Sequence, residues 1–279
     1  MIEHIGIPTP AGTFDALAAG PEDGRPVLLL HGFPQASLEW EHQLATLSSA
    51  GYRAVAPDQR GYSPAVRPER PEDYRTEEIV GDALAMADEL GWSRFDLVGH
   101  DWGGTIAWAT AADHADRVRT LTVVSTPHPH ALARAIRTDP DQQQRSAYMA
   151  DFRQVRSPER QFLADDATPL RRIFEGRIPR GHVEEYVQRL TEPGALAAAL
   201  NWYRGVKYSG HTGPITVPTL YVWSTEDPTI GSTAALGTEE WVEGPYRFEM
   251  LEDVSHWIPE EADETLSRLL LEHLSAARV

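Results

Sequence analysis

The amino-acid sequence predicts an α/β protein in which helices cover both faces of a mainly parallel sheet. Short apolar runs alternate with helix-like stretches along most of the chain. The run 27–30 is continuously apolar, which is typical of a strand buried on both faces. The length of 279 residues suits one large domain, or a core with an inserted subdomain.

Each predicted element has its own local signal. Apolar residues at helical spacing predict a helix over 76–90, which Gly91 ends, and a last helix begins at Pro259 with acidic residues in its first turn. The predicted strands are short apolar runs: 27–30, 54–56, 95–98, 121–124, 220–223 and a weaker 246–251. Further helices are predicted over 37–49 and 105–112.

Residues 129–210 interrupt this alternation. The segment contains no strong strand pattern, and prolines separate its helix-like pieces. We therefore expect a helical cap over 129–210, inserted into a core formed by residues 1–128 and 211–279.

Composition restricts the possible partners and location. Acidic residues outnumber basic ones by 42 to 25, for a net charge of −17, which argues against nucleic acid or an anionic membrane as partner. The chain has no cysteine and no stretch of the roughly 18 apolar residues that a membrane span needs. Residues 1–10 lack the pattern of a signal peptide, so we expect a cytoplasmic protein.

The most informative motif is Gly-His-Asp-Trp-Gly-Gly at residues 99–104, between a predicted strand and a predicted helix. A nucleophile flanked by glycines on a sharp turn occupies this setting in the nucleophile elbow. Serine is the usual occupant, whereas here it is Asp101. A carboxylate is already ionised at neutral pH, so Asp101 can attack an electrophilic carbon without a base to deprotonate it.

Other polar residues follow the predicted strands directly, where ligands bind in sheets of this kind. The segment 31–34 (His-Gly-Phe-Pro) follows the first strand, Asp227 follows the strand 220–223, and His256 follows the last strand. The order nucleophile, acid, histidine is that of α/β-hydrolase triads. Glu226 is the nearest competitor for the role of the acid.

These residues resemble the α/β-hydrolase fold family over essentially the whole chain, and within that family they most resemble epoxide hydrolases. The matching motifs are residues 31–34, 99–104, 201–204 (Asn-Trp-Tyr-Arg) and 255–257 (Ser-His-Trp). The resemblance implies a mostly parallel eight-stranded sheet with a helical cap. It also implies that Asp101 is the nucleophile, His256 the base and Asp227 the carboxylate that orients the base.

The same resemblance assigns further roles. The backbone N–H groups of Phe33 and Trp102 would form an oxyanion hole, and Phe33–Pro34 would be a cis peptide. Tyr203 and, by a looser match, Tyr148 would be the cap acids that protonate the alkoxide leaving group. We also expect substrate contacts from Phe33, Trp102, Trp202 and Trp257. The expected partners are an organic epoxide and water, with no metal or organic cofactor.

Two alternatives stay open from the sequence: a haloalkane dehalogenase-like C–X hydrolase and a catalytically silent binding protein. Haloalkane dehalogenases share an aspartate followed by tryptophan, but they usually carry Asn or Glu where Phe33 stands. Fluoroacetate dehalogenases usually carry arginines where Trp102 and Thr105 stand. A catalytically silent binding protein on the same scaffold is the alternative of another class. The sequence leaves the particular epoxide undetermined, along with a choice between monomer and dimer.

The remaining histidines near these motifs have structural interpretations. His31 and His100 adjoin functional positions and are expected to belong to the scaffold. His128 and His130, where the predicted cap begins, are expected at the surface.

Overall fold

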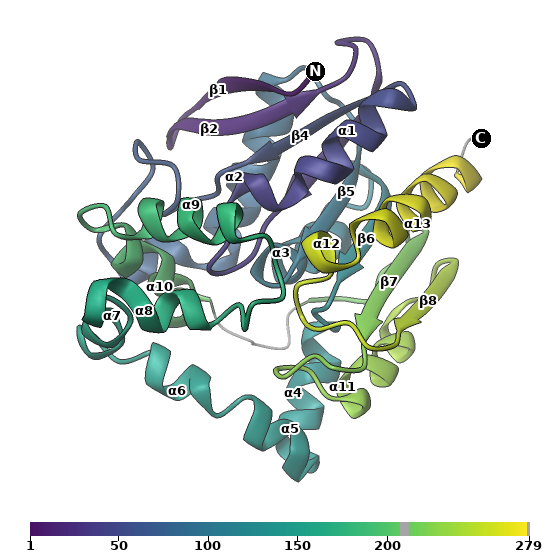
Figure 1. Cartoon of the computed structure of the whole chain (residues 1–279). Helices are drawn as coiled ribbons and strands as arrows, with labels where there is room; N and C mark the ends of the chain where they lie inside the picture. Colours follow the sequence, from purple (N-terminus) through teal and green to yellow (C-terminus); the bar gives the residue numbers. More distant parts are fainter. Residues whose placement is uncertain (207–211, 278–279) are drawn as a thin grey trace.

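The computed structural model describes residues 1–206 and 212–277. An eight-stranded sheet lies at its centre, with the strand order β1-β2-β4-β3-β5-β6-β7-β8 (Figure 1). Strand β2 runs antiparallel to β1 and β4, and every neighbouring pair from β4 to β8 is parallel. The predicted fold class, a mostly parallel eight-stranded sheet with helices on both faces, is confirmed.

All six strands expected from apolar runs are present. The strands are β1 (Glu3–Thr9), β2 (Gly12–Ala19), β3 (Arg25–Leu30), β4 (Tyr52–Pro57), β5 (Phe95–His100), β6 (Val118–Val124), β7 (Thr219–Ser224) and β8 (Tyr246–Leu251). The pattern of apolar runs did not reveal β1 and β2. Strand β1 lies at the sheet edge and buries only Ile7, so it carries little apolar signal.

The alternation of side chains along the strands builds a core on each face of the sheet. In β3, Leu28 and Leu30 enter one core, whereas Val27 and Leu29 enter the other. Helices α2 (Thr76–Glu89) and α3 (Trp102–Asp113) cover the first face. Helices α1 (Glu41–Ser49) and α13 (Asp263–Ala276) pack together on the second.

Two predicted helices are each divided. The stretch 37–49 begins as a 3-10 turn, η1 (Ser37–Trp40), and α1 follows. Asp58 Oδ1 accepts the Ser37 N–H at 2.8 Å at the start of that turn. The last helix is divided into α12 (Ile258–Glu261) and α13, because Ala262 between them has non-helical torsion angles of −124° and 39°. The other short elements are η2 (Pro71–Tyr74), α11 (Ser232–Leu236) and η3 (Gly237–Trp241).

Seven helices lie between β6 and β7 in the described part of the chain, and Figure 1 shows most of them gathered beside the lower end of the sheet. They are α4 (Pro129–Thr138), α5 (Pro140–Arg145), α6 (Tyr148–Phe152), α7 (Ser157–Phe162), α8 (Ala164–Arg172), α9 (Arg180–Leu190) and α10 (Ala195–Gly205). The predicted cap end between residues 210 and 211 falls outside the described residues.

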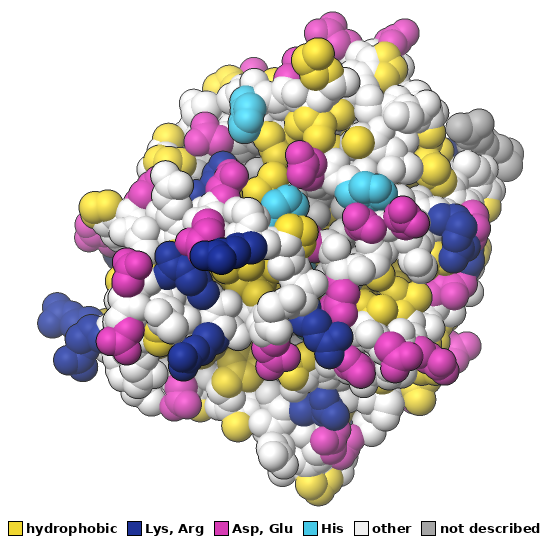
Figure 2. All heavy atoms as spheres, viewed as in Figure 1, with side chains coloured by type: hydrophobic (Ala, Val, Ile, Leu, Met, Phe, Trp, Pro, Cys, Tyr) yellow, Lys and Arg dark blue, Asp and Glu magenta, His cyan; other side chains and the backbone are white. Residues whose placement is uncertain are grey.

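The acidic excess is dispersed where the surface can be seen. Figure 2 shows Asp and Glu side chains spread over one face, with Lys and Arg side chains among them. None of the described helices combines the length and apolar character needed to cross a membrane.

Candidate active site

Asp101 lies on the sharp turn between β5 and α3. Its φ of 49° and ψ of −118° are torsion angles that a residue with a side chain rarely adopts. The neighbouring glycines leave room for this turn, since a Cβ on Gly103 would lie 2.1 Å from the Leu30 carbonyl oxygen. A Cβ on Gly32 would lie 2.4 Å from the Asp101 Cβ. The turn therefore presents the Asp101 carboxylate at the end of the sheet.

The structure brings Asp101, Asp227 and His256 together from three different strand ends. His256 Nδ1 lies 2.7 Å from Asp227 Oδ2, and His256 Nε2 lies 3.5 Å from Asp101 Oδ2. Asp227 is an acceptor, so it orients Nδ1–H toward itself and leaves Nε2 facing Asp101. This is the geometry of a nucleophile, a base and an orienting acid.

The loop after β7 determines which acid meets His256. Asp227 Oδ1 accepts the backbone N–H groups of Thr229 and Ile230 at 2.8 and 3.0 Å, and the Thr229 hydroxyl at 2.8 Å. Its Oδ2 is thereby left for His256. The competitor Glu226 is exposed and pairs with Arg177 at 2.6 Å. Asp227, and not Glu226, is the carboxylate that lies against His256.

The charges of this cluster stabilise one another. Burial lowers the pKa of His256, but Asp227 and Asp101 outweigh burial and raise the pKa of His256 to about 10. Burial likewise opposes ionisation of both carboxylates, yet His256 holds the pKa of Asp101 and that of Asp227 below their usual range. The two carboxylates thus favour the protonated form of His256, and His256 favours their ionised forms.

One backbone N–H group donates to the Asp101 carboxylate. The Phe33 N–H donates to Asp101 Oδ1 at 2.9 Å, and Phe33–Pro34 is a cis peptide, as the resemblance implied. Trp102 directly follows Asp101 in the chain and is the first residue of α3. Both predicted oxyanion donors therefore belong to residues beside Asp101.

A cavity of about 170 Å³ opens over Asp101 and His256. The two predicted tyrosines both line it, with their ring centroids 6.2 Å apart. Except for Asp101 and His256, its described lining is uncharged: Phe33, Tyr148, Phe152, Ile173, Tyr203, Pro228, Thr229 and Trp257. Sequence reasoning did not identify Phe152, Ile173, Pro228 or Thr229, although Thr229 follows Asp227 at the spacing of an Asx turn.

The four aromatic residues expected to contact substrate divide into two pairs. Phe33 and Trp257 line the cavity, whereas Trp102 and Trp202 are not in its lining. The Trp202 indole N–H donates to the Arg60 carbonyl oxygen at 2.8 Å. Consecutive helical residues point about 100° apart, so placing Tyr203 in the cavity turns Trp202 away from it. Trp102 packs edge-on against Tyr203, with ring centroids 4.9 Å apart.

Two histidine assignments have different outcomes. His31 lies in the scaffold: its Nε2 accepts the Gln59 N–H at 3.0 Å, and burial lowers the pKa of His31 to about 4. The surface assignment of His128 is wrong, because His128 is fully buried and stacks on Trp241 with ring centroids 5.4 Å apart. His130 is half-buried beside them.

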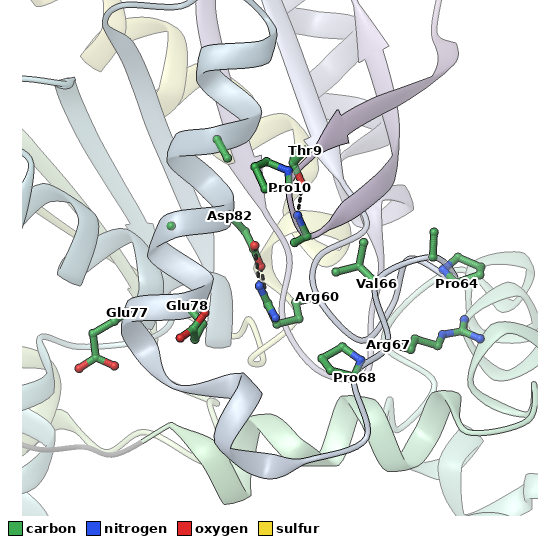
Figure 3. Close-up of a pocket in the computed structure, with 14 residues that line it drawn as sticks. Thr9, Pro10, Arg60, Pro64, Val66, Arg67, Pro68, Glu77, Glu78 and Asp82 are labelled. Carbon is green, nitrogen blue, oxygen red and sulfur yellow. Dashed lines mark hydrogen bonds and ion pairs between the residues drawn. The ribbon is translucent and has the colours of Figure 1, made fainter.

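A larger pocket, of about 720 Å³, lies elsewhere in the molecule (Figure 3). It lies between α2, the loop that carries Arg67 and the turn after Thr9. Arg60 and Asp82 form a two-fold ion pair there, at 2.6 and 2.7 Å. Its described lining contains no member of the Asp101 cluster. The smaller cavity is therefore the candidate active site, since it holds the chemically competent residues.

Comparison with known proteins identifies the class. A family model described as alpha/beta hydrolase fold matches residues 25–263. The chain is 32% identical to AB hydrolase superfamily protein YfhM of Bacillus subtilis (strain 168), over 94% of each chain. It is also 32% identical to epoxide hydrolase A of Mycobacterium tuberculosis (strain ATCC 25618 / H37Rv), covering 91% of this chain and 92% of that protein.

Solved structures agree with this result. The crystal structure of a Bacillus megaterium epoxide hydrolase in complex with an inhibitor superposes with a TM-score of 0.88 at 27% identity, covering 98% of this chain and 100% of that one. The chain belongs to the α/β-hydrolase fold family. It is a hydrolase similar to the epoxide hydrolases, as the sequence motifs predicted.

Proposed function

We propose that this protein hydrolyses organic epoxides to vicinal diols through a covalent ester on Asp101. The observation that carries the proposal is the position of His256 between Asp101 and Asp227, under a cavity lined by Tyr148 and Tyr203. The named epoxide hydrolases among the relatives support the same activity.

The first step is attack by Asp101 Oδ2 on an epoxide carbon. A carbon–oxygen ester bond forms and a carbon–oxygen bond of the strained ring breaks. The resulting alkoxide is a poor leaving group unless it takes a proton, and a tyrosine hydroxyl is a suitable donor. Tyr203 and Tyr148, which line the cavity, are the proposed donors.

The second step is hydrolysis of the ester. Esterification removes the Asp101 charge 3.5 Å from His256 Nε2, so His256 gives up its proton more readily in the intermediate. That proton restores the tyrosine hydroxyl that protonated the alkoxide. Neutral His256 then takes a proton from water, which attacks the ester carbonyl carbon. The Phe33 and Trp102 N–H groups stabilise the oxyanion on Oδ1, and such a donor is typically worth about 10²–10³ in rate. The bond between the carbonyl carbon and the diol oxygen then breaks, and that oxygen takes the proton of the new carboxyl group. The diol leaves, and the Asp101 carboxylate and the protonated His256 are restored.

A single turnover in ¹⁸O-labelled water tests the covalent step. Attack on the ester carbonyl places the label in Asp101 and leaves the first diol molecule unlabelled. The His256→Gln variant should accumulate the ester, visible as a mass increase equal to the epoxide, and Asp101→Asn should form none. Label that enters the diol directly, with none in Asp101, would overturn the mechanism.

Replacing the tyrosines tests the choice of substrate class. An alkoxide needs an acid and a halide does not, so Tyr203→Phe and Tyr148→Phe should each slow epoxide opening. Steady halide release from haloalkanes by the doubly substituted enzyme would instead indicate a dehalogenase. Failure to form any covalent adduct with a panel of epoxides and haloalkanes would indicate a binding protein.

A further inference from the structure

A buried acid with no part in the proposed steps lies behind the catalytic cluster. The side chains of Glu39, in η1, and of His100, the last residue of β5, are both 0% exposed. Glu39 Oε2 lies 3.3 Å from His100 Nδ1. His100 directly precedes Asp101, so this pair lies immediately next to the proposed nucleophile.

The other ring nitrogen of His100 reaches the proposed base. His100 Nε2 lies 3.0 Å from the backbone carbonyl oxygen of His256, and the ring centroids of the two histidines are 5.0 Å apart. The same carbonyl oxygen accepts the Ser125 hydroxyl at 2.9 Å. His100 and Ser125 therefore both hold the backbone carbonyl of His256.

The acceptor at His100 Nε2, the His256 carbonyl oxygen, determines the tautomer of His100. A carbonyl oxygen can only accept, so His100 Nε2 must carry a hydrogen. In a neutral ring Nδ1 is then an acceptor, and its partner Glu39 must be the donor. Only a protonated carboxyl group can donate. The same contacts with an ionised Glu39 would require a doubly protonated His100.

The surroundings of the pair favour the uncharged form. Burial and the charges of Glu260 and Asp101 raise the pKa of Glu39 well above its usual range. Burial and the cationic His256 lower the pKa of His100 to about 3. Glu260, whose side chain is 2% exposed, is bonded to Gln35, His182 and Tyr186, and its negative charge opposes ionisation of Glu39.

We propose that Glu39 is a positioning residue: as an uncharged carboxylic acid it donates to His100 Nδ1, and His100 Nε2–H in turn holds the backbone of His256. The proposal rests on the proposed function for the role of His256. Because His256 acts only on the ester, this chain of hydrogen bonds serves the second step and not the first.

The matched variants are Glu39→Gln and Glu39→Leu. The amide N–H of Gln can still donate to Nδ1, so ester hydrolysis in Glu39→Gln should stay close to the wild-type rate. Leu cannot donate, and hydrolysis should slow by roughly 10-fold, the equivalent of one buried hydrogen bond. Ester formation should be unchanged in both, whereas a general loss of packing would slow both steps.

Spectroscopy measures the protonation states of Glu39 and His100 independently of activity. The infrared spectrum should contain the stretch of a protonated carboxyl group that is absent in Glu39→Gln, and ¹⁵N NMR should show His100 protonated at Nε2 alone. A carboxylate at Glu39, a doubly protonated His100, or hydrolysis as slow in Glu39→Gln as in Glu39→Leu would overturn the proposal. If the wild type forms no ester, the proposed function fails, and the spectra still decide the state of Glu39.

Discussion

His256 Nδ1 lies 2.7 Å from Asp227 Oδ2, while Asp227 Oδ1 is held by three donors from Thr229 and Ile230. In Asp227→Asn the remaining oxygen would keep those donors, and the amide N–H would face His256 Nδ1. The ring would then carry its proton on Nε2, where the base must accept one. We expect turnover to fall by roughly 10³–10⁴-fold, measured as kcat.

The matched control for that variant is its neighbour. Glu226→Gln removes an exposed charge that pairs with Arg177, and it should leave turnover unchanged. Equal losses in the two variants would show that Asp227 does not orient the base.

The pKa of His256 offers a second prediction. Two carboxylates raise it to about 10 in the free site, so loss of one should lower it by roughly one to three units. NMR titration of His256 in Asp101→Asn measures this directly, because that variant removes the same charge as the ester does.

The pH dependence of ester hydrolysis should follow the lowered pKa of His256. Since only neutral His256 can accept a proton from water, the single-turnover hydrolysis rate should rise with pH and level off below the pH at which free His256 titrates. A hydrolysis rate that does not change with pH would contradict the role of His256 as base.

Alanine substitutions at two helical glycines should change the free energy of unfolding in opposite directions. A Cβ at Gly103 would lie 2.1 Å from the Leu30 carbonyl oxygen, so Gly103→Ala should reduce the free energy of unfolding by about 1–3 kcal/mol. A Cβ at Gly81, within α2, would meet nothing within 4 Å, so Gly81→Ala should increase it by about 0.5–1 kcal/mol. Urea denaturation measures both, and a stabilised Gly103→Ala would refute the close packing at the elbow.

His182 joins helix α9 to helices α1 and α12, and its ion pairs should make stability depend on pH. His182 Nδ1 lies 2.6 Å from Glu260 Oε1, and His182 Nε2 lies 3.4 Å from Glu41 Oε2. Hydrogen bonding to Glu260 outweighs burial and raises the pKa of His182 above its ordinary 6.5. A raised pKa stabilises the folded state below about pH 6.5, and this contribution is lost as pH rises through the folded-state pKa.

The expected difference is therefore between acid and alkaline conditions. His182→Gln should lose up to about 1 kcal/mol of unfolding free energy at pH 6, and less at pH 9. Tyr186→Phe, which removes another hydrogen bond to Glu260, should cost about the same at both pH values. A pH-independent loss in His182→Gln would rule out the titration.

The positions of Asp101, Asp227 and His256 could be predicted because each follows a strand signal directly. Parallel strands end at one edge of the sheet, so residues that follow them meet there whatever their separation in sequence. The motif also indicated the glycines that permit the turn at Asp101. Edge strand β1, with only Ile7 buried, carried no comparable signal.

Local patterns were therefore sufficient for the fold class and for the meeting of Asp101, Asp227 and His256 at one edge of the sheet, because strand periodicity and strand-end motifs depend on neighbouring residues. They could not determine which face of α10 enters the cavity. In the structure that face carries Tyr203, and Trp202 points away from the cavity. Nor could they reveal that His128 is buried or that Glu39 lies against His100. Those features depend on contacts between segments distant in the chain, and only the packing of the helices, the loops and the sheet decides them.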